Sequence, residues 1–351
     1  MSHAQLKIQL LKMLAELQPV EDIDFRPIET WALEARLGAA AFDLVGKTAN
    51  VNYPTWQKQF YTNIFRHTLH QKVFTELATS LQAKEIDILL LKGAAISRLA
   101  WSEPYLRFQA DVDFMVRRES MHMVSEQMLA AGFEFKKPHA IGQFFADLPL
   151  TNKEGQLEMY APVKQDVMIE VHSEVFLGHV QRITSDRQER KLWEKRVSID
   201  WPNEANVQHW RLSNEDLLLH TLIHTAVNHQ FNKDTQRNLI DLIRLENRLE
   251  VDWNTLHDQI KLMKVQTPVW LVLSIMQDVF GRTEFEQLAK QLEVSRVRKF
   301  LLKKLVNKES ILDLQVINQT KWRYALLLLM VDRPLDMLRL LMQLPKISQE
   351  R

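Results

Sequence analysis

Apolar residues at helical spacing dominate both ends of the chain. From Pro54 to about residue 84 they recur every three or four positions with polar residues between them, beginning at Trp56 and Phe60, which is typical of a long amphipathic helix opened by a proline. Residues 1–18 form another amphipathic pattern. Helical spacing returns after about residue 210, and Ser213–Asp216 has the capping-box signature of a helix start. We expect the later helices at 213–231, 236–249, 254–263, 268–280, 296–307 and 320–343.

The middle of the chain has a different pattern. Ile86–Leu91 is a short apolar run typical of a buried strand, and Ala110–Val116 alternates as a half-buried strand does. Further strands are predicted at Leu157–Ala161, Val167–His172 and Val197–Ile199, with a turn at Pro162–Asp166 and short helices at Ala94–Trp101 and 118–131.

These patterns together predict an α+β fold. A small mixed β-sheet core in residues 85–210 lies between an N-terminal helical extension, residues 1–84, and a C-terminal helical domain, residues 211–351. Because a small sheet inside a helical protein is a common place for chemistry, we expect the functional residues in the core.

Composition excludes several function classes. Only 8 of the 351 residues are glycine, about 2%, where average usage is roughly 7%. The chain contains neither a Walker phosphate loop nor a Rossmann fingerprint, so the two large nucleotide-binding classes that carry these motifs lose their usual signature. With no cysteine there is no disulfide, thiol nucleophile or Cys-ligated metal site.

Charge and hydropathy indicate which partners and which cellular location to expect. Lys and Arg number 45 against 44 Asp and Glu, a net charge of +1, so a long nucleic acid is not the expected partner. The longest apolar run, Tyr324–Val331, is far shorter than the ~20 residues of a membrane span. The charged N-terminal helix does not have a signal-peptide pattern. We expect a cytoplasmic protein with no membrane association.

Carboxylates in the predicted sheet are the strongest candidate for chemistry. Asp111 and Asp113 are two residues apart on one predicted strand and therefore share a face. Glu170 lies on a later strand, on the face opposite the apolar residues Val167, Ile169 and Val171. Converging carboxylates repel one another and require a cation or a raised pKa. Since oxygen ligands without thiols suit hard cations, the pattern favours Mg²⁺ or Mn²⁺. An isolated Asp-X-Asp is more often only the exposed face of a strand.

Four segments together resemble the uncharacterised nucleotidyltransferase family of the DNA polymerase β-like superfamily. They are Leu91–Ala95, Tyr105–Arg107, Asp111–Val116 and Ile169–His172. The segment Leu212–His220, followed by His224, His229 and Asp241, also resembles the helical part of that family. The resemblance covers roughly residues 30–250.

The resemblance implies a two-metal nucleotidyl transfer. Asp111 and Asp113 would hold Mg²⁺ ions that bridge the triphosphate of ATP or another NTP. Glu170 would complete one metal site and help to deprotonate the acceptor hydroxyl, and pyrophosphate would leave.

The phosphate-binding motif departs from the superfamily pattern. The usual Gly-Gly or Gly-Ser pair stands some ten residues before the acidic pair, whereas here Lys92-Gly93-Ala94 has no serine and Gly93 precedes Asp111 by 18 residues. Lys92 and the backbone at Gly93 would still offer charge and N–H groups to phosphate. The alternative for Gly93 is a plain tight turn.

The remaining site candidates have both functional and structural interpretations. Arg107 supports phosphate or the metal site, or else pairs with Asp111 or Asp87. His172 orients Glu170 or reaches the nucleotide, or is an ordinary strand histidine. The resemblance also implies that His224 and His229 shape the acceptor side, with Asp241 as an orienting partner. The alternative is that these histidines are buried and structural. For the pair His220 and His224, a zinc site is a further alternative.

We therefore predict Mg²⁺-dependent transfer of a nucleoside monophosphate, AMP from ATP in the favoured form, to a hydroxyl of a small molecule, peptide or protein. One alternative is an inactive nucleotide-binding or protein-interaction module of the same fold. Another is an RNA-terminal nucleotide adder, whose only support is a basic run between residues 296 and 308; a solvated helix face is the favoured interpretation of that run.

Overall fold

The computed structural model describes residues 1–16, 23–46, 51–135, 156–161, 167–175, 186–201, 207–281, 283–314, 320–333 and 337. The chain forms two compact units, which we call the helical unit and the sheet unit. Among the described residues, those within 1–57 and 218–337 form the helical unit, and those within 58–175 and 186–217 form the sheet unit. Each unit thus combines segments that are distant in sequence. The expected division at residues 84 and 210 stays a prediction.

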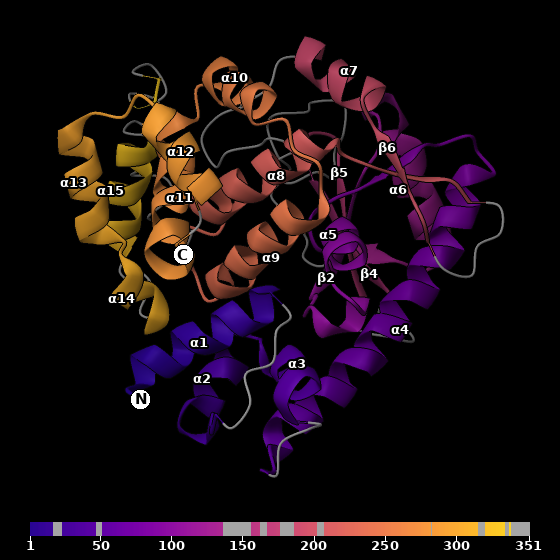
Figure 1. Cartoon of the computed structure of the whole chain (residues 1–351). Coiled ribbons are helices and arrows are strands. Elements are labelled where there is room, and N and C mark those ends of the chain that lie inside the picture. Colours follow the sequence, from indigo (N-terminus) through magenta and orange to yellow (C-terminus); the bar gives the residue numbers. More distant parts are fainter. Residues whose placement is uncertain are drawn as a thin grey trace. The chain divides into compact units, whose positions relative to one another are not determined.

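The sheet unit is built on a mixed sheet with strand order β3-β4-β5-β2-β1-β7-β6 (Figure 1). β2 pairs in parallel with β5 and β1 in parallel with β7, whereas the β1–β2, β3–β4, β4–β5 and β6–β7 pairs are antiparallel. The strands are β1 (Ile88–Leu90), β2 (Asp111–Met115), β3 (Glu134–Phe135), β4 (Gln156–Ala161), β5 (Val167–His172), β6 (Val197–Ile199) and β7 (His209–Arg211).

Helices of the sheet unit cover this sheet with aromatic and aliphatic side chains. Phe74 of α4 packs on Phe114 of β2 at 5.5 Å between ring centroids, and on Trp201 at 4.8 Å. α5 contacts β2. The helices are α4 (Pro54–Gln82, from residue 58 onward), α5 (Lys92–Ala100), η3 (Pro104–Leu106), η4 (Arg118–Ser120), α6 (Met121–Ala130) and α7 (Asp186–Glu194).

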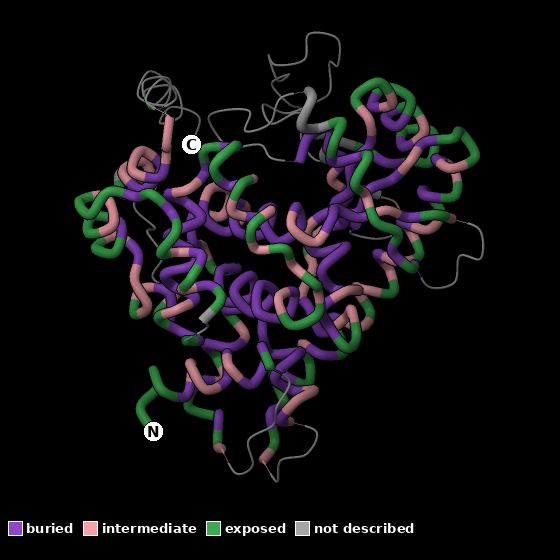
Figure 2. Tube along the Cα trace, turned by 45° about the horizontal axis from the view of Figure 1, so that its top comes forward, coloured by how far each residue is buried: buried purple, intermediate pink, exposed green. Residues whose placement is uncertain are grey.

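The helical unit has its own apolar core. α11 (Gln266–Phe280) is buried along nearly its whole length. Figure 2 colours the described residues of the chain by their burial. Arg244 of α9 donates from Nε to the carbonyl oxygen of Leu14 at 2.8 Å and so joins α9 to α1. The other elements are α1 (His3–Glu16), η1 (Arg26–Ile28), α2 (Glu29–Glu34), α3 (Gly38–Ala41), η2 (Phe42–Gly46), η5 (His224–Asn228), α9 (Thr235–Arg248), α10 (Trp253–Met263), α12 (Thr283–Gln291), α13 (Arg296–Leu305), α14 (Lys308–Leu312) and α15 (Thr320–Met330).

The structure confirms the mixed α+β fold that the pattern predicts. The predicted strands around residues 88, 113, 159, 169 and 198 are present, and Ser213 Oγ accepts from the backbone N–H of Asp216 at 3.2 Å at the start of α8 (Asn214–Ile223). β3, β7, α7, α12 and α14 are not among the predicted elements. The turn predicted at 162–166 lies outside the described residues.

Two predicted helices are too long. The helix expected to reach residue 231 changes to the π-helical turn η5 after Ile223, and Gln230 and Phe231 adopt left-handed backbone. The helix expected at 320–343 ends at Met330, because the residue before Pro334 is disfavoured in helical conformation. Asp332 instead accepts the backbone N–H of Thr267 at 2.9 Å. Beyond Arg333, that predicted helix lies outside the described residues, except Met337.

None of the helices in the described part of the chain has the length and apolar character needed to cross a membrane.

Candidate active site

The register of two neighbouring strands brings the candidate carboxylates together. β2 and β5 run in parallel with Asp113 opposite Glu170 and Met115 opposite His172. Because paired residues in a sheet project to the same face, the side chains of Asp113 and Glu170 lie side by side. Asp113 and His172 are each only 3% exposed.

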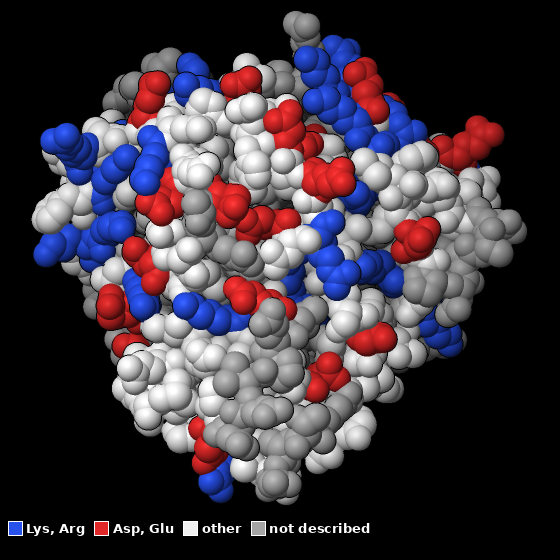
Figure 3. Space-filling model, viewed as in Figure 1, with Lys and Arg blue, Asp and Glu red and all other residues white. Residues whose placement is uncertain are grey.

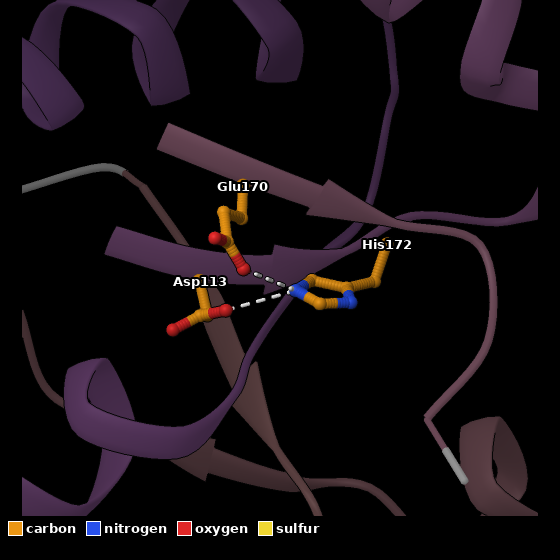
Figure 4. Close-up of side chains that lie close together, drawn as sticks. All are labelled: Asp113, Glu170 and His172. Carbon is orange, nitrogen blue, oxygen red and sulfur yellow. Dashed lines mark hydrogen bonds and ion pairs between the residues drawn. The ribbon is translucent and has the colours of Figure 1, made fainter. Parts of the chain in front are cut away.

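His172 completes the cluster. Its Nε2 lies 2.9 Å from Asp113 Oδ1 and 3.7 Å from Glu170 Oε2 (Figure 4). One ligand atom from each of the three residues lies within 4.8 Å of the others. Two carboxylates and an imidazole form a donor set that fits a divalent cation such as Mn²⁺ or Mg²⁺. His172 thus contacts both carboxylates, and a role in orienting Glu170 or reaching the nucleotide stays a prediction.

Asp111 precedes this cluster on the same strand and face. Its side chain is half-buried, and its negative charge raises the pKa of both Lys92 and Glu170. Among the described residues, the group close enough to share one ion is Asp113, Glu170 and His172, and it does not include Asp111. A direct metal contact of Asp111 therefore stays a prediction.

The ammonium group of Lys92 contacts the carboxylates of Asp113 and Glu170. Its Nζ donates to Asp113 Oδ1 at 2.5 Å and to Glu170 Oε2 at 3.3 Å. Lys92 is the first residue of α5 and has a left-handed backbone with φ of 42°, a conformation that costs a non-glycine residue about 1 kcal/mol or more. The contact with phosphate that the family resemblance implies for Lys92 stays a prediction.

The charges in this cluster shift one another strongly. Burial alone would raise the pKa of Asp113, but the ammonium of Lys92 and the hydrogen bond from His172 hold it below its usual value. Burial raises the pKa of Glu170 well above its usual range; Lys92 opposes this shift, and the charges of Asp113 and Asp111 add to it. Burial favours neutral Lys92, yet the carboxylates outweigh it and raise the pKa of this amine. The two carboxylates therefore have different proton affinities.

Gly93 leaves room for two neighbouring side chains. A Cβ at Gly93 would lie 2.5 Å from Arg107 Nη1 and 2.8 Å from Gln109 Nε2, so these two polar side chains rest on the backbone at the N-terminal end of α5. The left-handed backbone falls on Lys92 and not on Gly93. Arg107 is 6% exposed. Asp87, one of its two proposed ion-pair partners, has an ion pair with Arg196 at 3.5 Å.

α4 carries a buried polar face that is not among the sequence predictions. His67 hydrogen-bonds to Gln109, and Asn63 and His70 are 4% and 3% exposed. Within the described residues, the side-chain amide of Asn63 and both ring nitrogens of His70 lack a hydrogen-bond partner. Their spacing of three or four residues is the signal that would have placed them on one helix face.

We expect His70 to make stability depend on pH. Burial, followed by the charges of Arg66 and His67, lowers the pKa of His70 to about 4 in the folded protein. In the unfolded chain the pKa of the same histidine is about 6.5. The unfolded state therefore binds the extra proton as pH falls below about 6.5, and the contribution of neutral His70 to stability is lost between there and about 4. From pH 7 to pH 5 this loss is about 2 kcal/mol. Urea unfolding of wild type and His70→Gln at both pH values measures it, and an equal decrease in both proteins would contradict it.

The histidines predicted on the acceptor side belong to the helical unit. The rings of His224 and His229 meet edge to face at 4.3 Å between centroids. His229 Nδ1 lies 2.8 Å from Asn232 Nδ2 and 3.8 Å from Asp234 Oδ2. Asp241 is fully buried on α9. These contacts describe a polar cluster within the helical unit, and the roles of His224, His229 and Asp241 towards an acceptor stay predictions.

The basic run forms α13. Figure 3 shows its Lys and Arg side chains gathered at the left of the view. Several are engaged within the helical unit: Arg298 pairs with Asp332 at 3.1 Å, and Lys303 pairs with Asp278 at 3.2 Å. These ion pairs favour the interpretation of a solvated helix face.

Comparison with known proteins gives one family and distant structural similarity. The family described as uncharacterised nucleotidyltransferase matches residues 21–281. The crystal structure of an antigenic nucleotidyltransferase-like protein from Paracoccidioides brasiliensis is similar at 16% identity and a TM-score of 0.39, covering 65% of this chain and 94% of that chain. The curated proteins gave no match. The family range contains β2 and β5 with their carboxylates.

Proposed function

The chain belongs to the uncharacterised nucleotidyltransferase family, and from this we propose that it transfers a nucleoside monophosphate, AMP from ATP, to a hydroxyl group of a small molecule, peptide or protein. The observation that carries the proposal is the buried group of Asp113, Glu170 and His172 on two adjacent parallel strands. Arg107 and the N-terminal end of α5 adjoin Gly93, the residue after Lys92.

Asp113 and Glu170 would hold a divalent cation, with Asp111 as the additional carboxylate on the same face. When bound, the cation would supply positive charge to the triphosphate. His172 keeps Asp113 oriented through its 2.9 Å contact. Arg107 would bind phosphate oxygens through its guanidinium.

The chemical step uses Glu170 as the base. Its carboxylate lies opposite Asp113 on the neighbouring strand, where in its ionised form it would accept the proton of the acceptor hydroxyl. The acceptor oxygen forms a bond to the α-phosphorus, its proton passes to the Glu170 carboxylate, and the bond from the α-phosphorus to the bridging oxygen breaks. That oxygen keeps the electron pair and leaves as pyrophosphate.

Incubation with ATP labelled at the α-phosphate, Mg²⁺ and cell extract as acceptor tests the proposal. We expect label transfer with an equal amount of pyrophosphate, and a return to background when a chelator removes the metal, because the triphosphate charge is then not neutralised. Asp111→Ala/Asp113→Ala is the negative control. Label transfer that survives both the chelator and the double substitution would contradict the proposal.

An inactive nucleotide-binding module is the second candidate. It is favoured by the position of Lys92, because its ammonium forms ion pairs with the carboxylate oxygens of Asp113 and Glu170 that a metal would bind. This candidate predicts a nucleotide-induced, Mg²⁺-dependent thermal shift without label transfer.

A further inference from the structure

The carboxylate oxygens of the candidate metal site already contact a cation of the chain itself. Asp113 Oδ1 lies 2.5 Å from Lys92 Nζ, and Glu170 Oε2 lies 3.3 Å from the same atom. His172 Nε2 contacts these two oxygens as well. The ammonium thus bridges the two strands at the point where a divalent cation would bridge them.

The backbone holds Lys92 in this place. The N–H of Leu91 donates to the carbonyl oxygen of Asp113 at 3.0 Å. This backbone hydrogen bond keeps Lys92, the next residue, close to Asp113, whose carboxylate its side chain contacts. Lys92 then takes a left-handed backbone with φ of 42°, and its side chain is 17% exposed. A lysine does not favour this conformation, so the β1–β2 pairing and the two ion pairs must maintain it.

Ammonium and metal cannot both occupy these oxygens. Mg²⁺ binds carboxylate oxygens at roughly 2.0–2.1 Å, which places an ion bound to Asp113 Oδ1 and Glu170 Oε2 in the region that Nζ occupies. Two cations so close together in a buried site repel strongly. A metal at these atoms therefore requires Lys92 to move away.

We propose that Lys92 is an internal cation that competes with the divalent metal for Asp113 and Glu170, so that metal binding releases its ammonium. This inference rests on the proposed function for the identity of the metal. Because Lys92 begins α5 immediately before Gly93, the released ammonium remains beside the N-terminal end of that helix and becomes available to the triphosphate. Metal binding would then prepare the nucleotide site.

Metal affinity of a charge-free variant tests the competition. We expect Lys92→Met, which keeps a long side chain without the charge, to bind Mn²⁺ about tenfold tighter or more than wild type, measured by the loss of the free Mn²⁺ signal in electron paramagnetic resonance. Lys84→Met removes an exposed lysine of the same unit and should leave the affinity unchanged. Lys92→Met/Asp113→Asn should lose the gain. Equal or weaker Mn²⁺ binding by folded Lys92→Met overturns the proposal.

A second measurement uses the wild-type protein and covers the case in which Lys92→Met does not fold. Brief acetylation with an N-hydroxysuccinimide ester, read by peptide mass spectrometry, reports how accessible each lysine is. We expect saturating Mn²⁺ to raise acetylation of Lys92 at least about threefold, because metal displaces its ion pairs, with Lys84 unchanged. Constant or reduced acetylation of Lys92 in the metal-bound protein overturns the proposal.

The results also separate this inference from the proposed function. If Lys92→Met binds Mn²⁺ more tightly but neither protein transfers label from ATP, the competition stands and the nucleotidyl transfer fails. If wild type transfers label in a Mg²⁺-dependent way while Lys92→Met shows no gain in affinity, the transfer stands and the competition fails.

Discussion

Asp113→Asn is expected to reduce the rate of nucleotidyl transfer at least about a thousandfold, because the Asp113 carboxylate contacts both Lys92 and His172 and would hold the metal. Asp113 Oδ1 accepts from Lys92 Nζ at 2.5 Å and contacts His172 Nε2 at 2.9 Å. Asparagine keeps the shape of the side chain and removes its charge, so both the metal ligand and the partner of Lys92 are weakened together. Initial rates with α-labelled ATP and Mg²⁺ measure the effect.

The controls separate chemistry from folding. Glu119→Gln removes an exposed carboxylate of the same unit and should keep the rate within about twofold of wild type, as surface substitutions usually do. Circular dichroism should show that Asp113→Asn retains its helical and strand content. A folded Asp113→Asn protein that keeps a tenth or more of the wild-type rate would show that Asp113 is not a metal ligand in the reaction.

The sequence predicts which side chains of the site share a face of their strand, because period-two alternation survives in both strands. Asp111 and Asp113 alternate with apolar residues on β2, and Glu170 and His172 alternate with apolar residues on β5. Alternation fixes which side chains share a face. It does not fix the register between strands, and the structure supplies that with Asp113 opposite Glu170.

The position of Lys92 could not be predicted from its residue type. A lysine at the start of a helix ordinarily has right-handed backbone and an exposed side chain, whereas Lys92 has φ of 42° and points into the carboxylates. This arrangement depends on the pairing of β1 with β2, a contact between segments some 25 residues apart in sequence. Local pattern carries no information about such a contact.

The strand β7 illustrates a second limit. His209 and Arg211 are polar residues, so their alternation with Trp210 predicts no buried strand; both are nevertheless buried. Arg211 Nη1 donates to the side-chain oxygen of Asn214 at 2.9 Å, and β7 pairs in parallel with β1 more than a hundred residues earlier. Buried polar groups with such specific partners hide a strand from hydropathy analysis.

Gly93→Ala tests whether the space that Gly93 leaves for Arg107 and Gln109 serves the reaction. We expect the rate of label transfer to fall about a hundredfold while the free energy of unfolding changes by less than about 1 kcal/mol. Alanine favours a helix over glycine by about 1 kcal/mol, and the atoms that its Cβ would meet are the flexible ends of Arg107 and Gln109. These ends can move aside, which preserves the fold but misplaces the guanidinium that would bind phosphate. Initial rates and urea unfolding of the same preparation measure the two effects.

Gly132→Ala is the matched control because it reverses the two effects. Gly132 has φ of +86° and nothing within 4 Å of a Cβ position, so alanine there is strained without crowding a neighbour. We expect Gly132→Ala to lose about 1 kcal/mol of stability with an unchanged transfer rate. If Gly93→Ala instead loses stability and keeps its rate, Gly93 is the plain turn of the alternative interpretation, and Arg107 has no role in holding the triphosphate. We therefore expect loss of rate without loss of stability at Gly93, and loss of stability without loss of rate at Gly132. This result requires that the reaction depends on the space above Gly93 and not on the conformational freedom of its backbone.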